Sequence, residues 1–162
     1  MNTVNLRRIV PWLAIAAAIA LADQASKQAI VSALRFGETV RITDFFNLVL
    51  AYNRGAAFSF LADAQGWQRE LFIGIAAIAV VVIFVLLLKH SGERLFCAGL
   101  SLILGGALGN VWDRALLGHV VDFLDFHAFG WHWPAFNVAD SAISVGAALL
   151  ILDSFRAKPG KT

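Results

Sequence analysis

Two long stretches without a charged residue limit what this chain can fold into. The run from Leu71 to Leu88 and the run from Leu95 to Trp112 each extend over 18 residues without Lys, Arg, Asp or Glu. A helix needs roughly 20 apolar residues to cross the hydrocarbon core of a bilayer, which is about 30 Å thick. Only the short segment 89–94, KHSGER, separates the two runs. The pair therefore predicts two transmembrane helices joined by a tight, charged turn.

The composition agrees with a membrane protein. Of the 162 residues, 59% are hydrophobic and 15% are charged, against about 45–50% and about 25% in soluble domains. This apolar excess is too large for one soluble core, and a net charge of +2 without a basic run does not suit nucleic-acid binding. We expect residues 1–162 to form a single integral membrane domain.

Two further spans are predicted, at about 10–34 and 137–154. The first has a competing interpretation, because Arg7 and Arg8 precede an apolar run that ends in Ala-Leu-Ala, the pattern of a cleavable signal peptide. The sequence then continues in helical register without Pro or Gly as far as Gly37. We interpret 10–34 as a retained transmembrane helix, and the two central spans as covering about 71–88 and 95–113.

Basic residues set the expected orientation of four spans. Seven of them crowd into three short flanks on the side that holds both termini, and six are spread over longer segments on the other side. The first group is Arg7, Arg8, Lys89, Arg94, Arg156, Lys158 and Lys161, and the second is Lys27, Arg35, Arg41, Arg54, Arg69 and Arg114. The positive-inside rule therefore predicts that both termini are cytoplasmic.

The outer segment after the first span has a different pattern. ETVRITDFFNLVLAYN alternates apolar and polar residues at first and is rich in Val, Ile and Phe, which predicts a β element at about 36–60. Residues Asp63 to Glu70 resemble a short interfacial helix. The expected fold class is an all-α membrane protein with four transmembrane helices, a small extracytoplasmic β-rich cradle and a short interfacial helix.

Polar residues within these apolar segments are the candidates for function. An Asp at the centre of a membrane helix costs about 2.5–3.5 kcal/mol on insertion scales, so such groups usually face the protein interior and mark a site. The candidates in or beside the spans are Asp23, Lys27, Asn110, Asp113, Arg114, Asn137 and Asp140, and those in the outer loops are Asn53 and Asp122. In the proposed topology they all lie in the outer half of the membrane.

Several of these features also have a purely structural explanation. The small residues of GGALGN, at 105–110, allow close helix packing or the approach of a substrate backbone. Arg114 could anchor at the headgroups, and Asp23 with Lys27 could form a simple ion pair one turn apart. The aromatic residues between 123 and 136 are expected to form an interfacial belt.

No metal or cofactor is predicted. His127 and His132 lie five residues apart in a loop, with no third ligand suggested, and the single cysteine, Cys97, excludes a multi-cysteine site.

The carboxylates suggest chemistry of their own. Asp122 and Asp140 bracket a loop that is short enough to bring its ends together. Two carboxyl groups in one low-dielectric pocket share a proton, so that one can activate water while the other hydrogen-bonds the carbonyl under attack. Spacing alone does not choose Asp122 over Asp125. It also leaves open a small proton-coupled transporter that uses the same acids as a relay, whereas a non-catalytic assembly factor would leave them unexplained.

Five sequence blocks resemble the successive motifs of one family, bacterial lipoprotein signal peptidase (signal peptidase II). The blocks are ADQASK (22–27), NRGAAFS (53–59), GGALGNVWDR (105–114), VVDF (120–123) and FNVADS (136–141). They occur in the family's order and span nearly the whole chain. The resemblance places Asp23 inside the mature protein, against the cleavable signal peptide.

The resemblance implies an intramembrane aspartic endopeptidase of the bacterial inner membrane. Such an enzyme cuts prolipoproteins just before a cysteine that carries diacylglycerol, and the motifs put the catalytic pair on Asp122 and Asp140 rather than Asp125. Residues implied to bind substrate or shape the site are Asn53, Gly55, Asn110, Arg114 and Asn137, with Asp23 and Lys27 in support. The implied partners are diacylglyceryl-prolipoprotein substrates, the phospholipid bilayer and globomycin-type cyclic peptide inhibitors, with no cofactor, and the enzyme is expected to be a monomer whose active site lies near the periplasmic face.

Overall fold

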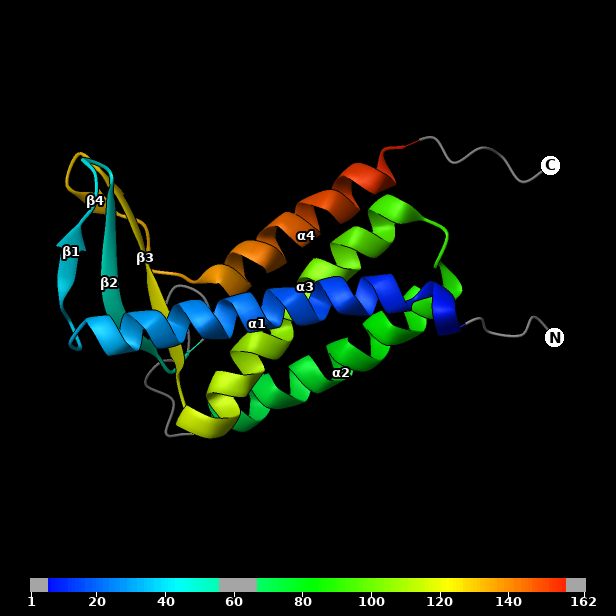
Figure 1. Cartoon of the computed structure of the whole chain (residues 1–162), viewed down its shortest axis with the longest axis horizontal. Coiled ribbons are helices and arrows are strands. Elements are labelled where there is room, and N and C mark those ends of the chain that lie inside the picture. Colours follow the sequence, from blue (N-terminus) through cyan, green and yellow to red (C-terminus); the bar gives the residue numbers. More distant parts are fainter. Residues whose placement is uncertain (1–5, 56–66, 157–162) are drawn as a thin grey trace.

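The computed structural model describes residues 6–55 and 67–156, which form a bundle of helices with a small sheet across one end (Figure 1). The helices are a short η1 (Leu6–Arg8), α1 (Val10–Ala33), α2 (Gln68–Lys89), α3 (Arg94–Leu117) and α4 (Val138–Ser154). The strands are β1 (Thr39–Arg41), β2 (Phe46–Asn53), β3 (Val120–Ala128) and β4 (Trp131–His132). Figure 1 shows that α1 begins and α4 ends at the end of the bundle opposite the sheet.

The helices occur where the hydropathy pattern predicts them. Within the described residues, α2 and α3 are long and apolar enough to cross a membrane, with mean hydropathies of 3.4 and 1.7 over their most apolar windows. The turn between them runs from Lys89 to Arg94, as expected. The structure contains α1 and α4 as helices, and their crossing of the membrane remains a prediction.

Helix α3 is the centre of the bundle and packs on its neighbours through glycines. A Cβ atom at Gly105 would lie 2.5 Å from the backbone oxygen of Ala16 on α1, and one at Gly106 would collide with the backbone oxygen of Ala139 on α4. Because no side chain could fit at these positions, the glycines allow the three helix backbones to come close. The structure thus confirms the helix-packing interpretation for this stretch.

Apolar packing fills the end of the bundle away from the sheet. The buried cluster consists of Ile9, Ala16, Ile83, Leu87, Cys97, Leu100 and Leu104. The opposite face of α2 leaves large apolar side chains such as Ile78 and Val81 exposed. Such a face suits contact with lipid.

The sheet is antiparallel in the order β1-β2-β3-β4, so it joins two segments that are far apart in the sequence. The sequence predicted only the first segment, at 36–60. The placement of Asp122, His127 and His132 in loops was wrong, because they lie on β3 and β4. Phe129 and Gly130 connect β3 to β4 with positive φ angles of 52° and 80°. Positive φ at both central residues matches the right-handed twist of a hairpin, so this segment folds back as two strands.

The predicted interfacial helix lies partly outside the described residues. Positions 63–66 are not described, and Gln68 to Glu70 form the first turn of α2.

Candidate active site

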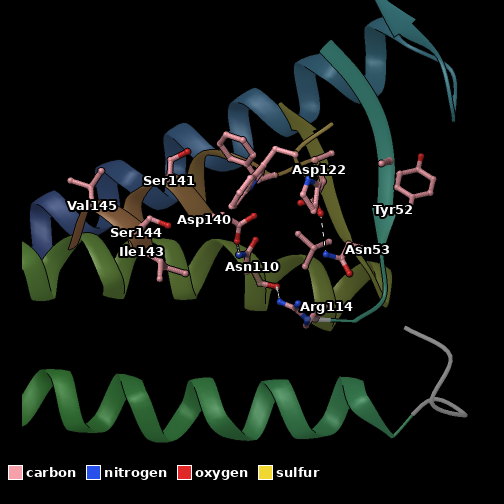
Figure 2. Close-up of a pocket in the computed structure, with 16 residues that line it drawn as sticks. Tyr52, Asn53, Asn110, Arg114, Asp122, Asp140, Ser141, Ile143, Ser144 and Val145 are labelled. Carbon is pink, nitrogen blue, oxygen red and sulfur yellow. Dashed lines mark hydrogen bonds between the residues drawn. The ribbon is translucent and has the colours of Figure 1, made fainter. Parts of the chain in front are cut away.

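Asp122 and Asp140 line the same cavity, which lies where the sheet meets the helices and has a volume of about 740 Å³. Figure 2 shows Asp122 approaching this space from β3 and Asp140 from the start of α4. The other polar residues of the lining are Tyr52, Asn53, Asn110, Arg114, Ser141 and Ser144. Asp125 is not part of the lining.

Two amides hold the Asp122 carboxylate. Asn53 donates from Nδ2 to Oδ2 at 3.1 Å, and Asn137 donates from Nδ2 to Oδ1 at 2.7 Å. Burial raises the pKa of Asp122 from its usual 3.8 to about 7, and the negative charge of Asp140 adds to the rise. The two amide hydrogen bonds and the charge of Lys27 offset only part of this effect. Asp122 therefore retains its proton to unusually high pH.

The start of α4 holds Asp140. Asn137 caps this helix by accepting the backbone N–H of Asp140 at 2.9 Å, and Asp140 Oδ2 in turn accepts the backbone N–H of Asn137 at 3.3 Å. Asn110 Nδ2 donates to Asp140 Oδ1 at 2.8 Å. A negative charge in the first turn of a helix is stabilised by the helix dipole. These contacts stabilise the ionised form of Asp140 against the opposing effect of its burial.

Arg114 ties α3 to the segment that follows β2. Its Nη2 donates to the backbone oxygen of Gly55 at 2.8 Å, and its guanidinium carbon lies 4.9 Å from the centre of the Phe72 ring. Gly55 N donates to Asn53 Oδ1 at 2.9 Å, so the same segment also orients Asn53. The guanidinium is held within the protein at the cavity, where it can shape the site.

A buried charge cluster lies behind the cavity. Lys27 Nζ is 2.7 Å from Asp23 Oδ2 and 2.9 Å from Asp113 Oδ2. Gln24 Nε2 donates to Asp113 Oδ1 at 2.8 Å. Sequence reasoning identified the pair on α1 but left the role of Asp113 open and missed Gln24. The ADQASK block contained the signal, because Gln24 lies within one turn of both Asp23 and Lys27.

Asp125 belongs to a different set of contacts. It lies three residues after Asp122 on the same strand, and side chains an odd number of residues apart point to opposite faces of a sheet. Asn47 Nδ2 donates to Asp125 Oδ2 at 2.8 Å, and His132 Nδ1 is 2.9 Å from Asp125 Oδ1. Burial alone would raise the pKa of Asp125, but the hydrogen bonds from Asn47 and His132 outweigh burial and lower it.

The histidines of this region form a stack. The rings of His127 and His132 lie 4.8 Å apart, centre to centre. Among the described residues no three His, Cys, Asp or Glu side chains are grouped as a metal site.

Two features of the lining were missed from the sequence. Ser141 and Ser144 continue the helix face that begins with Asn137 and Asp140, and this spacing of three and four residues could have identified them. The aromatic residues do not form one uniform belt: Trp133 and Phe136 line the cavity, and Phe123 is buried with 4% of its surface exposed. Only part of the predicted belt, such as Phe129 and Trp131, is fully or largely exposed.

Comparison with known proteins gives one consistent result. The model of the family described as signal peptidase (SPase) II matches residues 15–156. A lipoprotein signal peptidase of Ralstonia nicotianae is 61% identical over 146 residues, covering 90% of this chain and 84% of the relative. A lipoprotein signal peptidase of Paraburkholderia phytofirmans is 57% identical over 148 residues, covering 91% of this chain and 86% of the relative.

Solved structures agree at the level of the whole fold. One, described as a bacterial membrane enzyme, superposes with a TM-score of 0.83 at 31% identity and covers 95% of both chains. A second, described in the same words, gives a TM-score of 0.81 at 30% identity and covers 93% of this chain.

Proposed function

Because the chain belongs to the signal peptidase II family, we propose that Asp122 and Asp140 are the catalytic pair with which it cleaves its substrates. The chain is a membrane peptidase that removes signal peptides from prolipoproteins. The comparisons give no support to the alternative of a proton-coupled transporter. The observation that carries the catalytic assignment is that the two carboxylates line one cavity.

The proposed chemistry is that of an aspartic endopeptidase. Asp140, as the carboxylate, accepts a proton from a water molecule, and the water oxygen attacks the scissile carbonyl carbon. Asp122, as the protonated partner, donates its proton to the carbonyl oxygen, and a tetrahedral intermediate forms. When this intermediate collapses, the C–N bond breaks and the amine leaves with the proton that Asp140 accepted. One hydroxyl group of the intermediate returns its proton to Asp122 as the new carboxyl group forms, which restores the starting state of the pair. The raised pKa of Asp122 and the position of Asp140 at a helix N-terminus support these roles.

The remaining polar residues hold the substrate or the pair in this proposal. Asn53 and Asn137 bond Asp122, Asn110 bonds Asp140, and Arg114 bonds the backbone at Gly55. The last of these contacts fixes the chain beside the cavity, where a substrate backbone would pass. The charge pair of Asp23 and Lys27 supports the site from behind.

The shape of the cavity supports a lipidated substrate with an apolar signal helix. Its lining continues from Asp140 along α4 through Ile143 to Val145, into the depth expected for hydrocarbon. The signal peptide would lie along this arm. The cut would fall just before the diacylglyceryl-modified cysteine, whose acyl chains remain in the bilayer.

We further propose that the chain is a single multi-pass domain of the bacterial inner membrane, with α1 and α4 also spanning the bilayer. The basic residues Arg7, Arg8, Lys89 and Arg94 lie at the ends of η1, α2 and α3 that are far from the sheet. This distribution supports cytoplasmic termini and a cavity near the periplasmic face. We expect the enzyme to work as a monomer and to be blocked by globomycin-type cyclic peptides.

The test is a cleavage assay with purified protein in detergent and a fluorescent diacylglyceryl-prolipoprotein peptide. The wild-type protein is expected to release the signal peptide, and Asp122→Asn and Asp140→Asn are expected to lose almost all turnover. Asp125→Asn is the matched control, because it removes a carboxylate from the same strand without touching the cavity. Full activity in either of the first two variants would refute the catalytic assignment.

A further inference from the structure

Lys27 uses all of its hydrogen-bonding capacity inside the protein. The ammonium group lies 2.7 Å from Asp23 Oδ2, 2.9 Å from Asp113 Oδ2 and 3.0 Å from Asn110 Oδ1. A lysine has three N–H donors and no acceptor. Only 3% of the Lys27 surface is exposed, so these three contacts replace its hydration.

The third contact orients the Asn110 amide, together with a longer hydrogen bond of 3.3 Å from Asn137 Nδ2 to the same oxygen. Because the ammonium group can only donate, it requires the oxygen of this amide to face it. The amide nitrogen must then point the other way, where it donates to Asp140 Oδ1 at 2.8 Å. Without the ammonium group, only the longer hydrogen bond from Asn137 would oppose a turned amide, which would present its oxygen to the carboxylate.

The other two contacts reach the backbone next to each carboxylate of the proposed pair. Asp113 Oδ2 accepts the backbone N–H of Val121, the residue before Asp122, at 3.2 Å. Asp23 Oδ1 accepts the backbone N–H of Ala139, the residue before Asp140, at 2.9 Å. Lys27 therefore connects two carboxylates, of which Asp113 holds the backbone of β3 and Asp23 holds the backbone of α4. These two elements contain the proposed pair.

We propose that Lys27 is a positioning residue for cleavage, which sets the separation and hydrogen-bond polarity of Asp122 and Asp140 through Asn110, Asp113 and Asp23. The inference rests on the catalytic assignment above and deepens it. Lys27 does not contact substrate in this proposal. It acts through Asn110, which lines the cavity, and through Asp23 and Asp113 behind it. Its removal changes the geometry of the pair more than the binding of the substrate.

A plain structural ion pair is the competing explanation, and activity measurements separate the two. A structural pair contributes to folding, so its loss lowers the melting temperature and the fraction of active enzyme. It does not change the turnover or the pH profile of the molecules that remain folded. A positioning residue changes both, because small displacements of reacting groups cost about 10- to 100-fold in rate.

Lys27→Met is the direct test, since methionine has a similar length and no charge. We expect kcat to fall at least about tenfold, while KM for the fluorescent lipopeptide changes little. The alkaline limb of the pH profile should move to higher pH. The groups around Lys27 are the carboxylates of Asp23 and Asp113, with Asp122 and Asp140 beyond Asn110 and the guanidinium of Arg114 on the same helix as Asn110. Arg114 stays in the variant, but the loss of the Lys27 charge makes Asp122 harder to ionise.

Leu104→Ala is the control for general destabilisation. Leu104 is buried in the apolar cluster and makes none of the contacts of the pair. We expect it to lower the melting temperature and to leave the pH profile of the remaining activity unchanged. A Lys27→Met protein that behaves like Leu104→Ala would overturn the proposal.

A second variant is needed because Lys27→Met leaves the buried carboxylates of Asp23 and Asp113 without a positive charge beside them, and this can prevent folding. In Lys27→Met combined with Asp23→Asn and Asp113→Asn, all three charges of the cluster are removed together. We expect this protein to fold and to retain the low kcat. Wild-type kcat in the triple variant, or failure of both variants to fold, would show that Lys27 serves the fold alone.

The outcome is also separate from that of the catalytic assignment. If Asp122→Asn and Asp140→Asn are inactive while Lys27→Met keeps the wild-type profile, the positioning role fails and the catalytic pair stands. If Asp122→Asn or Asp140→Asn is active, the catalytic assignment is wrong, and the positioning proposal that rests on it is wrong as well.

Discussion

The Asn137 amide contacts both acids of the cavity: its Nδ2 lies 2.7 Å from Asp122 Oδ1, and its Oδ1 accepts the backbone N–H of Asp140 at 2.9 Å. One buried side chain thus caps α4 and reaches across to β3. The N-cap residue of α4 therefore also sets the position of Asp140 relative to Asp122.

Two substitutions of Asn137 should distinguish its role as the N-cap of α4 from its hydrogen bond to Asp122. Serine is a good N-cap but cannot reach Asp122, so we expect Asn137→Ser to keep most of the stability and to lose activity at least about tenfold. Asn137→Ala should lose activity and also destabilise the protein by about 0.5–2 kcal/mol. Turnover and thermal unfolding in detergent measure the two effects. Wild-type turnover in Asn137→Ser would show that the contact with Asp122 is dispensable.

The pH dependence of cleavage should reflect Asp122. Because its pKa is raised to about 7, the protonated carboxyl persists well above the usual 3.8 and is lost as the pH rises through about 7. With both acids ionised no proton is left for the carbonyl oxygen, so we expect kcat/KM to fall on the alkaline side of about pH 7. A profile that stays flat up to pH 9 at constant protein stability would contradict this role.

Gly109 should not tolerate a side chain. A Cβ atom there would lie 2.5 Å from Asp23 Oδ2, so Gly109→Ala must push this carboxylate away from Lys27. We expect a loss of about 1–3 kcal/mol in stability, as for other overpacked sites, together with reduced turnover. Gly74→Ala is the matched control, because a Cβ atom at Gly74 on α2 meets nothing within 4 Å. That variant should have a wild-type or slightly higher melting temperature and full activity.

Cys97→Ser should be fully active. Cys97 is buried in the apolar cluster and donates from Sγ to the backbone oxygen of His90 at 3.1 Å. It lies 13 residues before Asn110 on α3, which corresponds to roughly 20 Å along a helix. Turnover of the folded variant, measured with the lipopeptide substrate, tests this. Loss of turnover with normal folding would reveal a role for the thiol in cleavage.

The sequence predicted the helices because their signal is local. Uncharged runs such as 71–88 form helices in lipid whatever the rest of the chain does, since every backbone polar group must be satisfied within the segment. The polar residues of the site were identifiable for the same reason. A buried Asp23 or Asn110 is costly in an apolar segment and so stands out.

Strand β3 could not be predicted in this way, because its pairing is not local. Asp122 bonds Asn53, a residue 69 positions earlier in the chain, and the strand exists only because β2 supplies its hydrogen-bonding partners. Spacing alone left the choice between Asp122 and Asp125 open for this reason, and only the resemblance to family motifs favoured Asp122. Once the strand is known, the alternation of its side chains places the two acids on opposite faces.

The sheet has a consequence for how the molecule is assembled. During synthesis β1 and β2 emerge before α2 and α3, and β3 emerges only after both helices. The edge of β2 that pairs with β3 therefore has no partner strand until α2 and α3 have been synthesised. Asp140 follows later still, on α4. If Asp122 and Asp140 are the catalytic pair, as proposed, the active site is complete only after α4 has been synthesised, and a truncated chain that lacks α4 is expected to be inactive.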